Sequence, residues 1–227
     1  MDFVGIDKFS LLDYDEMVSV VLFAPGCNFR CPFCHNIQGV VDSKQFIPFD
    51  EIMDFLKSRT GVIDAVVISG GEPTLMPDLK DKIIQIRKLG FKIKLDSNGT
   101  RPNVIKELID EKLIDYVAMD IKNHLDKYDL VTATKVNKDV IQESIDLLMN
   151  SGIDYEFRTT LVNEYHTDKD MHEIGKLIAN CKRFYLQKYV YRDGVINKNL
   201  HPVDEVKALY FVSILKNYMP NVELRGY

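Results

Sequence analysis

The feature that most constrains the fold of this chain is a regular alternation between short apolar runs and segments with helical periodicity. Six runs are rich in β-branched and aromatic residues and have the length of buried strands. They cover residues 19–24, 64–69, 91–97, 115–120, 155–162 and 183–189. Apolar residues recur at helical spacing in residues 79–89, 104–109, 141–148 and 171–178, and a last helix is predicted over residues 203–217. This alternation is typical of a parallel sheet, so we predict an α/β fold, either a doubly wound open sheet or a partial barrel.

Residues that start and stop helices agree with this division. Gly90 and Gly152 stand where two helices are expected to end. Asp78 and Asn103 stand where the N-caps of two helices are expected.

Unusual polar groups follow the carboxyl ends of successive predicted strands. They are "GCNFRCPFCHN" after the first strand, "GGEPT" after the second, "DSNGT" at the third and "DIKN" at the fourth, with Arg158 inside the fifth. In a barrel all these ends meet on one face, whereas a doubly wound sheet brings together only the strands beside its switch point. The polar segments therefore favour a partial, open (βα)6 barrel of parallel strands, like an incomplete TIM barrel.

Composition and charge exclude several classes of protein. The formal charge is −5 and the 29 lysines and arginines are scattered, so nucleic-acid binding is disfavoured. The N-terminus lacks a basic start followed by an apolar run, and no stretch approaches the ~18 to 20 apolar residues of a membrane span. We expect a cytoplasmic protein with neither signal peptide nor membrane span. Because no linker or repeat interrupts the sequence, we expect one domain over residues 1–227, with residues 190–227 partly outside the barrel.

The cysteines predict a metal site with an open position. Cys27, Cys31 and Cys34 lie close together, whereas Cys181 is remote and is expected to be a small core residue. A structural zinc site needs four ligands, and His35 is a poor fourth because it adjoins another ligand. A [4Fe–4S] cluster held by three thiolates instead leaves one iron open to bind another molecule.

The spacing Cys27-x3-Cys31-x2-Cys34, with aromatic Phe33 before the last cysteine, resembles the signature of the radical S-adenosylmethionine (SAM) enzymes. In that family the open iron of the cluster binds the amino and carboxylate groups of the methionine part of SAM. An electron from the reduced cluster cleaves SAM and releases a 5′-deoxyadenosyl radical. The resemblance implies that the three cysteines hold a [4Fe–4S] cluster and that SAM is the second cofactor.

The segment "SGGEPTL" is similar to the Gly-Gly-Glu motif of that family, whose backbone and carboxylate receive the ammonium group of SAM. The matching residues are Gly70, Gly71 and Glu72. Two glycines allow the main chain to approach closely, and a carboxylate beside a bound ammonium stays ionised. The alternative is that Gly70, Gly71 and Pro73 only form a turn before the next helix.

Two further segments, "LDSNGT" and "AMDIKN", resemble the activating enzymes of glycyl radical enzymes. In that group aspartates and a hydroxyl surround a monovalent cation, Na+ or K+, and the matching residues are Asp96, Ser97 and Asp120. Two carboxylates that face one cavity repel each other unless a cation or a proton neutralises them, so positive charge is expected there. The alternative is that Asp96 and Asn98 only cap the turn before Pro102.

Other positions match side chains that reach SAM in these enzymes. Lys122 matches the lysine of an Asp-x-Lys segment, and Arg158 matches a strand arginine. A charge inside an apolar strand is costly unless it is paired, but Arg158 could also point to solvent. A family position that often holds histidine is Tyr189 or a neighbour here, so the ribose contact departs from the pattern. The expected cofactor-binding residues are Phe33, His35, Gly70, Gly71, Glu72, Ser97, Asn98, Asp120, Lys122, Arg158 and Tyr189.

The resemblance as a whole implies a cytoplasmic oxidoreductase that generates a glycyl radical on a partner enzyme, with flavodoxin or ferredoxin as electron donor. The length, "YRDG" and "VELRGY" most resemble the group that activates anaerobic ribonucleoside-triphosphate reductase. Activation of another glycyl radical enzyme, such as pyruvate formate-lyase, is the first alternative. A small-molecule radical SAM enzyme of the deazaguanine-synthase type and a non-catalytic iron or zinc module are the others.

Overall fold

The structure is a computed structural model that describes residues 1–34 and 43–227. The described chain divides into two compact units. The first unit contains residues 1–27 and 43–118, and the second contains residues 28–34 and 119–227. The expectation of one domain over residues 1–227 stays a prediction.

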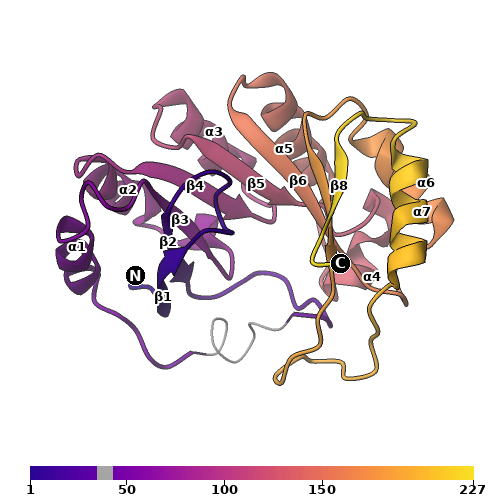
Figure 1. Cartoon of the computed structure of the whole chain (residues 1–227), viewed down its shortest axis with the longest axis horizontal. Coiled ribbons are helices and arrows are strands. Elements are labelled where there is room, and N and C mark those ends of the chain that lie inside the picture. Colours follow the sequence, from indigo (N-terminus) through magenta and orange to yellow (C-terminus); the bar gives the residue numbers. More distant parts are fainter. Residues whose placement is uncertain (35–42) are drawn as a thin grey trace. The chain divides into compact units, whose positions relative to one another are not determined.

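The first unit is built on a sheet whose strands succeed one another in sequence order (Figure 1). Its strands are β1 (Gly5–Ser10), β2 (Ser19–Ala24), β3 (Ala65–Gly70), β4 (Lys92–Ser97) and the start of β5 (Tyr116–Asp120). β1 pairs antiparallel with β2, whereas β2 with β3 and β3 with β4 are parallel. Parallel strands need crossover connections, and helices supply them here.

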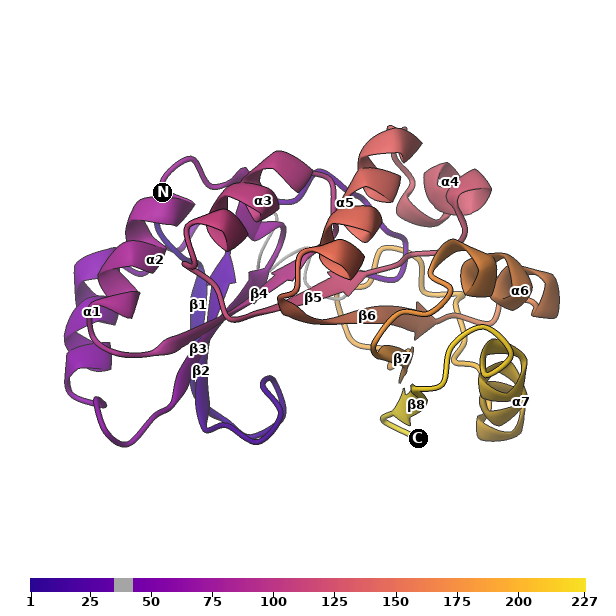
Figure 2. The same cartoon turned by 90° about the horizontal axis from the view of Figure 1, so that it is seen from above.

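Three helices cover the first unit, and Figure 2 shows them along one side of its strands. They are α1 (Phe49–Lys57), α2 (Leu79–Arg87) and α3 (Pro102–Asp110), with a short 3-10 helix at Pro73–Leu75. Each helix buries one apolar face, for example Ile52 and Leu56 in α1 and Ile83 and Ile86 in α2. The buried apolar residues recur at intervals of three and four, so a helix places them all on one face against the core.

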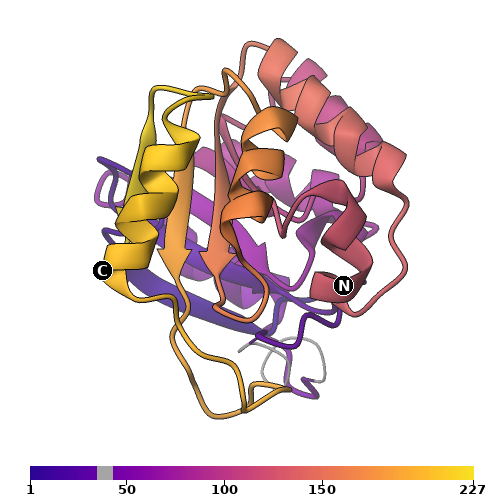
Figure 3. The same ribbon diagram turned by 90° about the vertical axis from the view of Figure 1, so that its right-hand side faces the viewer.

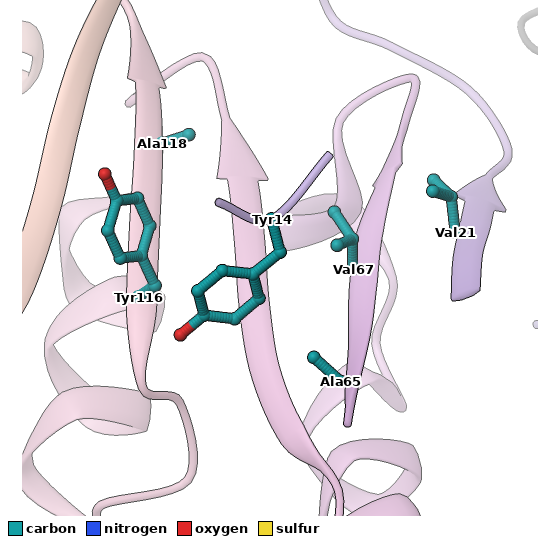
Figure 4. Packing of buried hydrophobic residues seen from close by; sticks show 6 residues of the cluster. All are labelled: Tyr14, Val21, Ala65, Val67, Tyr116 and Ala118. Atoms are coloured by element: carbon teal, nitrogen blue, oxygen red, sulfur yellow. The ribbon is translucent and has the colours of Figure 1, made fainter. Parts of the chain in front are cut away.

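The core of the first unit lies on the strand face opposite these helices (Figure 4). Its buried members come from alternate strand positions and from the loop after β1; they are Tyr14, Val21, Ala65, Val67, Tyr116 and Ala118. The rings of Tyr14 and Tyr116 have their centroids 5.5 Å apart. The ammonium of buried Lys94 lies 5.2 Å from the Tyr116 ring centroid and donates to the carbonyl of Asp13 at 2.6 Å. Because the strands are buried on both faces, they appear in the sequence as almost continuous apolar runs.

The second unit contains the end of β5 and strands β6 (Asp154–Leu161), β7 (Phe184–Lys188) and β8 (Val222–Arg225). β6 with β7 and β7 with β8 pair in parallel. Its helices are α4 (Tyr128–Thr132), α5 (Lys138–Asn150), α6 (Asp168–Leu177) and α7 (Glu205–Leu215), and a 3-10 helix covers Leu125–Lys127. Figure 3 shows α6 and α7 side by side against these strands.

The fold class predicted from the sequence is confirmed. All six predicted strands are present as β2 to β7, each within one residue at both ends. The strands are hydrogen-bonded neighbours in sequence order from β1 to β8, which is the order of a barrel and not of a doubly wound sheet. Among the described strands, β1 and β8 stand at the two ends of this order, so the barrel is incomplete.

The predicted helix ends are confirmed with one exception. Gly90 and Gly152 follow α2 and α5 with positive φ values of 93° and 79°, and Asp78 occupies the N-cap position of α2. The prediction for Asn103 was wrong, because α3 begins at Pro102 and its N-cap residue is Arg101. Proline suits the first helical position, since its φ is already helical and its missing N–H is not needed there.

No helix in the described part of the chain is both long enough and apolar enough to cross a bilayer.

Candidate active site

The loops that follow β2 and β3 are joined by backbone hydrogen bonds in the first unit. The Gly71 amide donates to the Ala24 carbonyl at 2.9 Å, and the Glu72 amide donates to the Gly26 carbonyl at 2.8 Å. These bonds bring the Gly-Gly-Glu segment against the start of the cysteine loop. The convergence predicted for the carboxyl ends of these two strands is therefore confirmed.

Gly70 allows this close approach. It pairs with Ala24 in the sheet register and has a φ of 106°. A Cβ atom at this position would lie 2.6 Å from the Ala24 amide nitrogen. Only glycine fits there, because both the positive φ and the short distance to the neighbouring strand exclude a side chain.

The side chain of Glu72 connects the loop after β3 to the end of β4. It is fully buried. Glu72 Oε1 accepts from the Thr74 amide at 3.1 Å and from the Ser97 hydroxyl at 2.9 Å, and Oε2 accepts from the Asn98 amide at 2.6 Å. Burial raises the pKa of Glu72, and the hydrogen bonds from Thr74, Asn98 and Ser97 oppose that rise. The carboxylate is thus a fixed acceptor between two loops, a structural role that its sequence motif does not reveal.

Asp96 and Asn98 are also tied into the first unit. Asp96 Oδ2 accepts from the hydroxyl of Ser69 at 2.8 Å. Asn98 Oδ1 accepts from the amide of Thr100 at 3.0 Å and from its hydroxyl at 2.7 Å. The interpretation that Asn98 caps its own turn is therefore confirmed, and its amide serves Glu72 at the same time.

In the second unit, Asp120 lies between two cationic side chains. Lys122 Nζ is 2.9 Å from Asp120 Oδ2, and Arg158 Nε is 3.0 Å from Asp120 Oδ1. Burial opposes ionisation of Asp120, but the charges and hydrogen bonds of Lys122 and Arg158 outweigh it and lower the pKa of Asp120 to about 2. The positive charge expected beside Asp120 is thus supplied by the chain itself.

Arg158 points into the second unit rather than to solvent. Its side chain is only 13% exposed. Its strand neighbours Tyr155, Phe157, Thr159 and Leu161 are buried on the other face of β6. The alternative of a solvent-facing arginine was therefore wrong, because alternate residues of this strand are covered on both faces.

The backbone between Asp120 and the following 3-10 helix is held by side chains from three elements. The Lys122 amide donates to Tyr128 Oη at 3.3 Å, and the Thr159 hydroxyl donates to the Ile121 carbonyl at 2.6 Å. His166 Nδ1 lies 3.0 Å from the Val162 amide nitrogen and 3.1 Å from the Val162 carbonyl oxygen, and its Nε2 lies 3.3 Å from the Lys122 carbonyl oxygen. Asp120 and Lys122 therefore stand on a segment with restrained backbone.

A family model described as the Radical SAM superfamily matches residues 21–178. The chain belongs to the radical SAM superfamily. It is therefore an enzyme that uses a [4Fe–4S] cluster and SAM, and the resemblance seen in the sequence is confirmed.

Individual relatives of this radical SAM chain include activating enzymes. It is 37% identical to "Putative glycyl-radical enzyme activating enzyme MJ1227" of Methanocaldococcus jannaschii, over 97% of this chain and 94% of the relative. It is 28% identical to the pyruvate formate-lyase-activating enzyme of Staphylococcus aureus, over 74% of this chain and 73% of the relative. A solved domain of the pyruvate-formate lyase-activating enzyme from Bacteroides vulgatus has the same fold, with a TM-score of 0.59 and 19% identity over 72% of this chain and 99% of that domain.

Main-chain hydrogen bonds shape the described part of the cysteine loop in this radical SAM chain. The Cys34 amide donates to the Cys31 carbonyl at 2.9 Å, which folds that part of the loop into a turn, and the Asn197 amide donates to the Pro32 carbonyl at 2.9 Å. Within the described ranges, no three His, Cys, Asp or Glu side chains form a set that could hold one metal ion. His35 lies outside the described residues.

Cys181 is not available as a fourth ligand. It is 1% exposed, and its sulfur lies 3.4 Å from Met219 Sδ. Burial raises the pKa of its thiol to about 12, so it stays protonated and unreactive. The prediction of a small core residue is confirmed, and the donor set leaves three cysteines for a cluster that has four irons.

The remaining predicted cofactor residues have different surroundings. Phe33 is buried in the second unit, with its ring centroid 6.2 Å from that of Tyr165. Tyr189 follows β7 and is 2% exposed, and its hydroxyl has no hydrogen-bond partner among the described residues. Burial raises the pKa of Tyr189, so the hydroxyl stays protonated and can donate.

Sequence reasoning missed several residues that support this site. They are Ser69, Thr74, Tyr128, Glu156, His166 and Arg225. One signal was present for Glu156, which stands two positions before Arg158 and so shares its face of the strand. Thr74 lies two residues from Glu72, inside the segment "GGEPT", so its position was also visible in the sequence. Ser69 and Arg225 pair with residues that are distant along the chain, and no pattern in the sequence marks them.

Proposed function

We propose that this radical SAM enzyme activates a glycyl radical enzyme by generating a glycyl radical on that partner. The observation that carries the proposal is the match to an activating enzyme of Methanocaldococcus jannaschii over nearly the full length of both chains. The match to a pyruvate formate-lyase-activating enzyme supports the same reaction class. The partner we propose is anaerobic ribonucleoside-triphosphate reductase, since the terminal "VELRGY" and "YRDG" resemble its activating proteins.

Residues of this chain have separate roles in the proposal. Cys27, Cys31 and Cys34 hold the cluster. When bound, the cluster and SAM supply a reductive cleavage that yields a 5′-deoxyadenosyl radical, for which flavodoxin or ferredoxin provides the electron. Other residues bind and orient SAM; in this proposal they are Phe33, His35, Gly70, Gly71, Glu72, Ser97, Asn98, Asp120, Lys122, Arg158 and Tyr189.

The second unit contains two cationic side chains, Lys122 and Arg158, that can bind the carboxylate of SAM. Lys122 and Arg158 share one carboxylate, that of Asp120, so this group of three carries a net positive charge. A carboxylate that joins them gains charge-assisted hydrogen bonds. Na+ or K+ beside Asp96, Ser97 and Asp120 is the less favoured addition, because Asp120 already has two cationic partners.

The experiment is anaerobic incubation of the cluster-loaded enzyme with SAM, a reductant and the reductase, followed by electron paramagnetic resonance. We expect the doublet of a glycyl radical on the reductase. Cys34→Ser should abolish it, and Cys181→Ser should retain it, because Cys181 lies in the core away from the cysteine loop. Cleavage of SAM without a doublet on the reductase would remove this partner, and a doublet on pyruvate formate-lyase instead would assign the alternative one.

A further inference from the structure

Charged side chains of the second unit form a continuous series that ends at β8. Arg225 in β8 binds Glu156 in β6 with both terminal nitrogens, at 2.9 Å to Oε1 and 3.0 Å to Oε2. The same Glu156 Oε1 lies 4.0 Å from Arg158 Nη1. Arg158 in turn is held by Asp120, which is held by Lys122. The signs of the charges alternate along the whole series.

Because Glu156 lies between Arg225 and Arg158, the loss of Arg225 would affect the position of Arg158. Glu156 is fully buried, so its negative charge must be compensated by neighbouring cations. Arg225 makes the bidentate pair, and Arg158 lies beyond hydrogen-bond distance from the same carboxylate. In the absence of Arg225, Arg158 is the cation best placed to move toward Glu156 and away from Asp120.

An aromatic ring on β7 and a carboxylate on β6 together hold the guanidinium of Arg225. In the parallel register Arg158 pairs with Tyr185 and Gln187 pairs with Arg225, so Arg225 lies two residues further along the strands than Arg158. The guanidinium carbon of Arg225 lies 3.4 Å from the centroid of the Tyr185 ring. Stacking on one side and a bidentate pair on the other define a single orientation of this guanidinium.

We propose that Arg225 is a positioning residue for SAM binding: by pairing with Glu156, it keeps Arg158 on Asp120 and directed to the carboxylate of SAM. The inference rests on the proposed role of Arg158. It assigns a function to the C-terminal strand, which supplies no residue to the expected cofactor set.

The test compares Arg225→Met with Arg225→Met/Glu156→Gln in the full-length, cluster-loaded protein. Affinity for SAM is measured anaerobically by equilibrium dialysis. Arg225→Met should weaken it by roughly tenfold or more, because a buried unpaired carboxylate then competes for Arg158. The double variant should return to within about threefold of the wild type, because the competing charge is gone. Lys216→Met, which removes an exposed cation from the end of α7, should leave the affinity unchanged.

A second readout follows Arg158 without any cofactor. The ¹H–¹⁵N signal of the Arg158 Nε–H group is assigned by its loss in Arg158→Lys. In the wild type, the hydrogen bond to Asp120 should slow the exchange of this proton with solvent. That protection should be lost in Arg225→Met and return in the double variant. Thermal unfolding midpoints of all variants show whether each one folds. If Arg225→Met does not fold, the affinity of the double variant for SAM tests the proposal by itself.

A double variant that binds SAM as weakly as Arg225→Met would overturn the proposal, as would an Arg225→Met protein with wild-type affinity and protection. These outcomes differ from failure of the proposed function. If Arg158→Met binds SAM normally, the role of Arg158 is wrong, whereas loss of the glycyl radical alone leaves the role of Arg225 intact.

Discussion

His166 is the fully buried imidazole whose two nitrogens are both committed to backbone groups. Its Nδ1 lies 3.0 Å from the Val162 amide nitrogen and 3.1 Å from the Val162 carbonyl oxygen, and its Nε2 lies 3.3 Å from the Lys122 carbonyl oxygen. Burial lowers the pKa of His166 from 6.5 to about 4, although its hydrogen bonds and Asp170 favour the charged form. This residue links the loop after β6 to the segment that carries Asp120 and Lys122.

A pH dependence of stability follows from that pKa. Above pH 6.5 the imidazole is neutral in both the folded and the unfolded chain and contributes no pH dependence. As the pH falls from 6.5 to about 4, the unfolded chain gains a proton that the folded chain does not, so stability is lost. The loss from this group amounts to about 3 kcal/mol.

The measurement is denaturant unfolding of the wild type and His166→Gln between pH 7 and pH 4. Glutamine keeps a donor and an acceptor but does not titrate, so the difference in unfolding free energy should shrink or change sign in favour of the variant as the pH falls. A difference that stays constant over this range would show that the pKa of His166 is the same in the folded and the unfolded chain.

At the residue scale, structural roles set by neighbouring sequence were predictable, whereas pairings between distant residues were not. Cys181 as a core residue and Asn98 as a turn cap followed from local composition and turn chemistry. Glu156 and Arg225 did not, because their pairing joins β6 to a strand that the sequence analysis did not identify. Asn103 was misplaced because Pro102 is itself the better start of the helix.

At the scale of elements, the approach of β3 to β2 determines where the Gly-Gly-Glu loop lies. Gly70 faces the Ala24 backbone, and the next two amides donate to carbonyls of the loop after β2. Main-chain hydrogen bonds alone therefore position this loop, independently of its side chains. A larger residue at Gly70 would separate the two strand ends.

Gly70→Ala and Gly90→Ala separate this steric effect from backbone strain. Both glycines have similar positive φ values, 106° and 93°, but a Cβ at Gly90 would meet nothing within 4 Å. Gly90→Ala should cost about 1 kcal/mol of unfolding free energy, the penalty of a left-handed conformation. Gly70→Ala should cost about 1–3 kcal/mol more, because the new methyl group must displace backbone. Equal losses in urea unfolding would show that the contact with Ala24 does not constrain the loop.

Strands with long apolar runs were predictable, whereas the two end strands were not, and one helix was missed although its pattern is present. The strands β2 to β7 are buried on both faces and therefore appear as apolar runs. β1 has three exposed residues among six, and β8 has only four residues, so neither produces such a run. Helix α1 does carry apolar residues at helical spacing, in Phe49, Ile52, Met53 and Leu56, and this signal was present in the sequence.

At the scale of the whole molecule, both compact units contain residues of the family signature. The matched region, residues 21–178, begins in the first unit and ends in the second. The first unit joins the Gly-Gly-Glu segment to the start of the cysteine loop, and the second holds the Asp120, Lys122 and Arg158 group. The charge series then extends the second unit's contribution to the last strand, which lies beyond the matched region.

The central claim is that a [4Fe–4S] cluster held by three cysteines binds SAM at its fourth iron. The most direct measurement is electron paramagnetic resonance of the reduced, anaerobically reconstituted protein before and after addition of SAM. We predict a cubane signal that changes on addition of SAM and that is lost in Cys27→Ala, Cys31→Ala and Cys34→Ala but kept in Cys181→Ala. A signal that SAM leaves unchanged, or a cluster that a fourth protein side chain completes, would contradict the account.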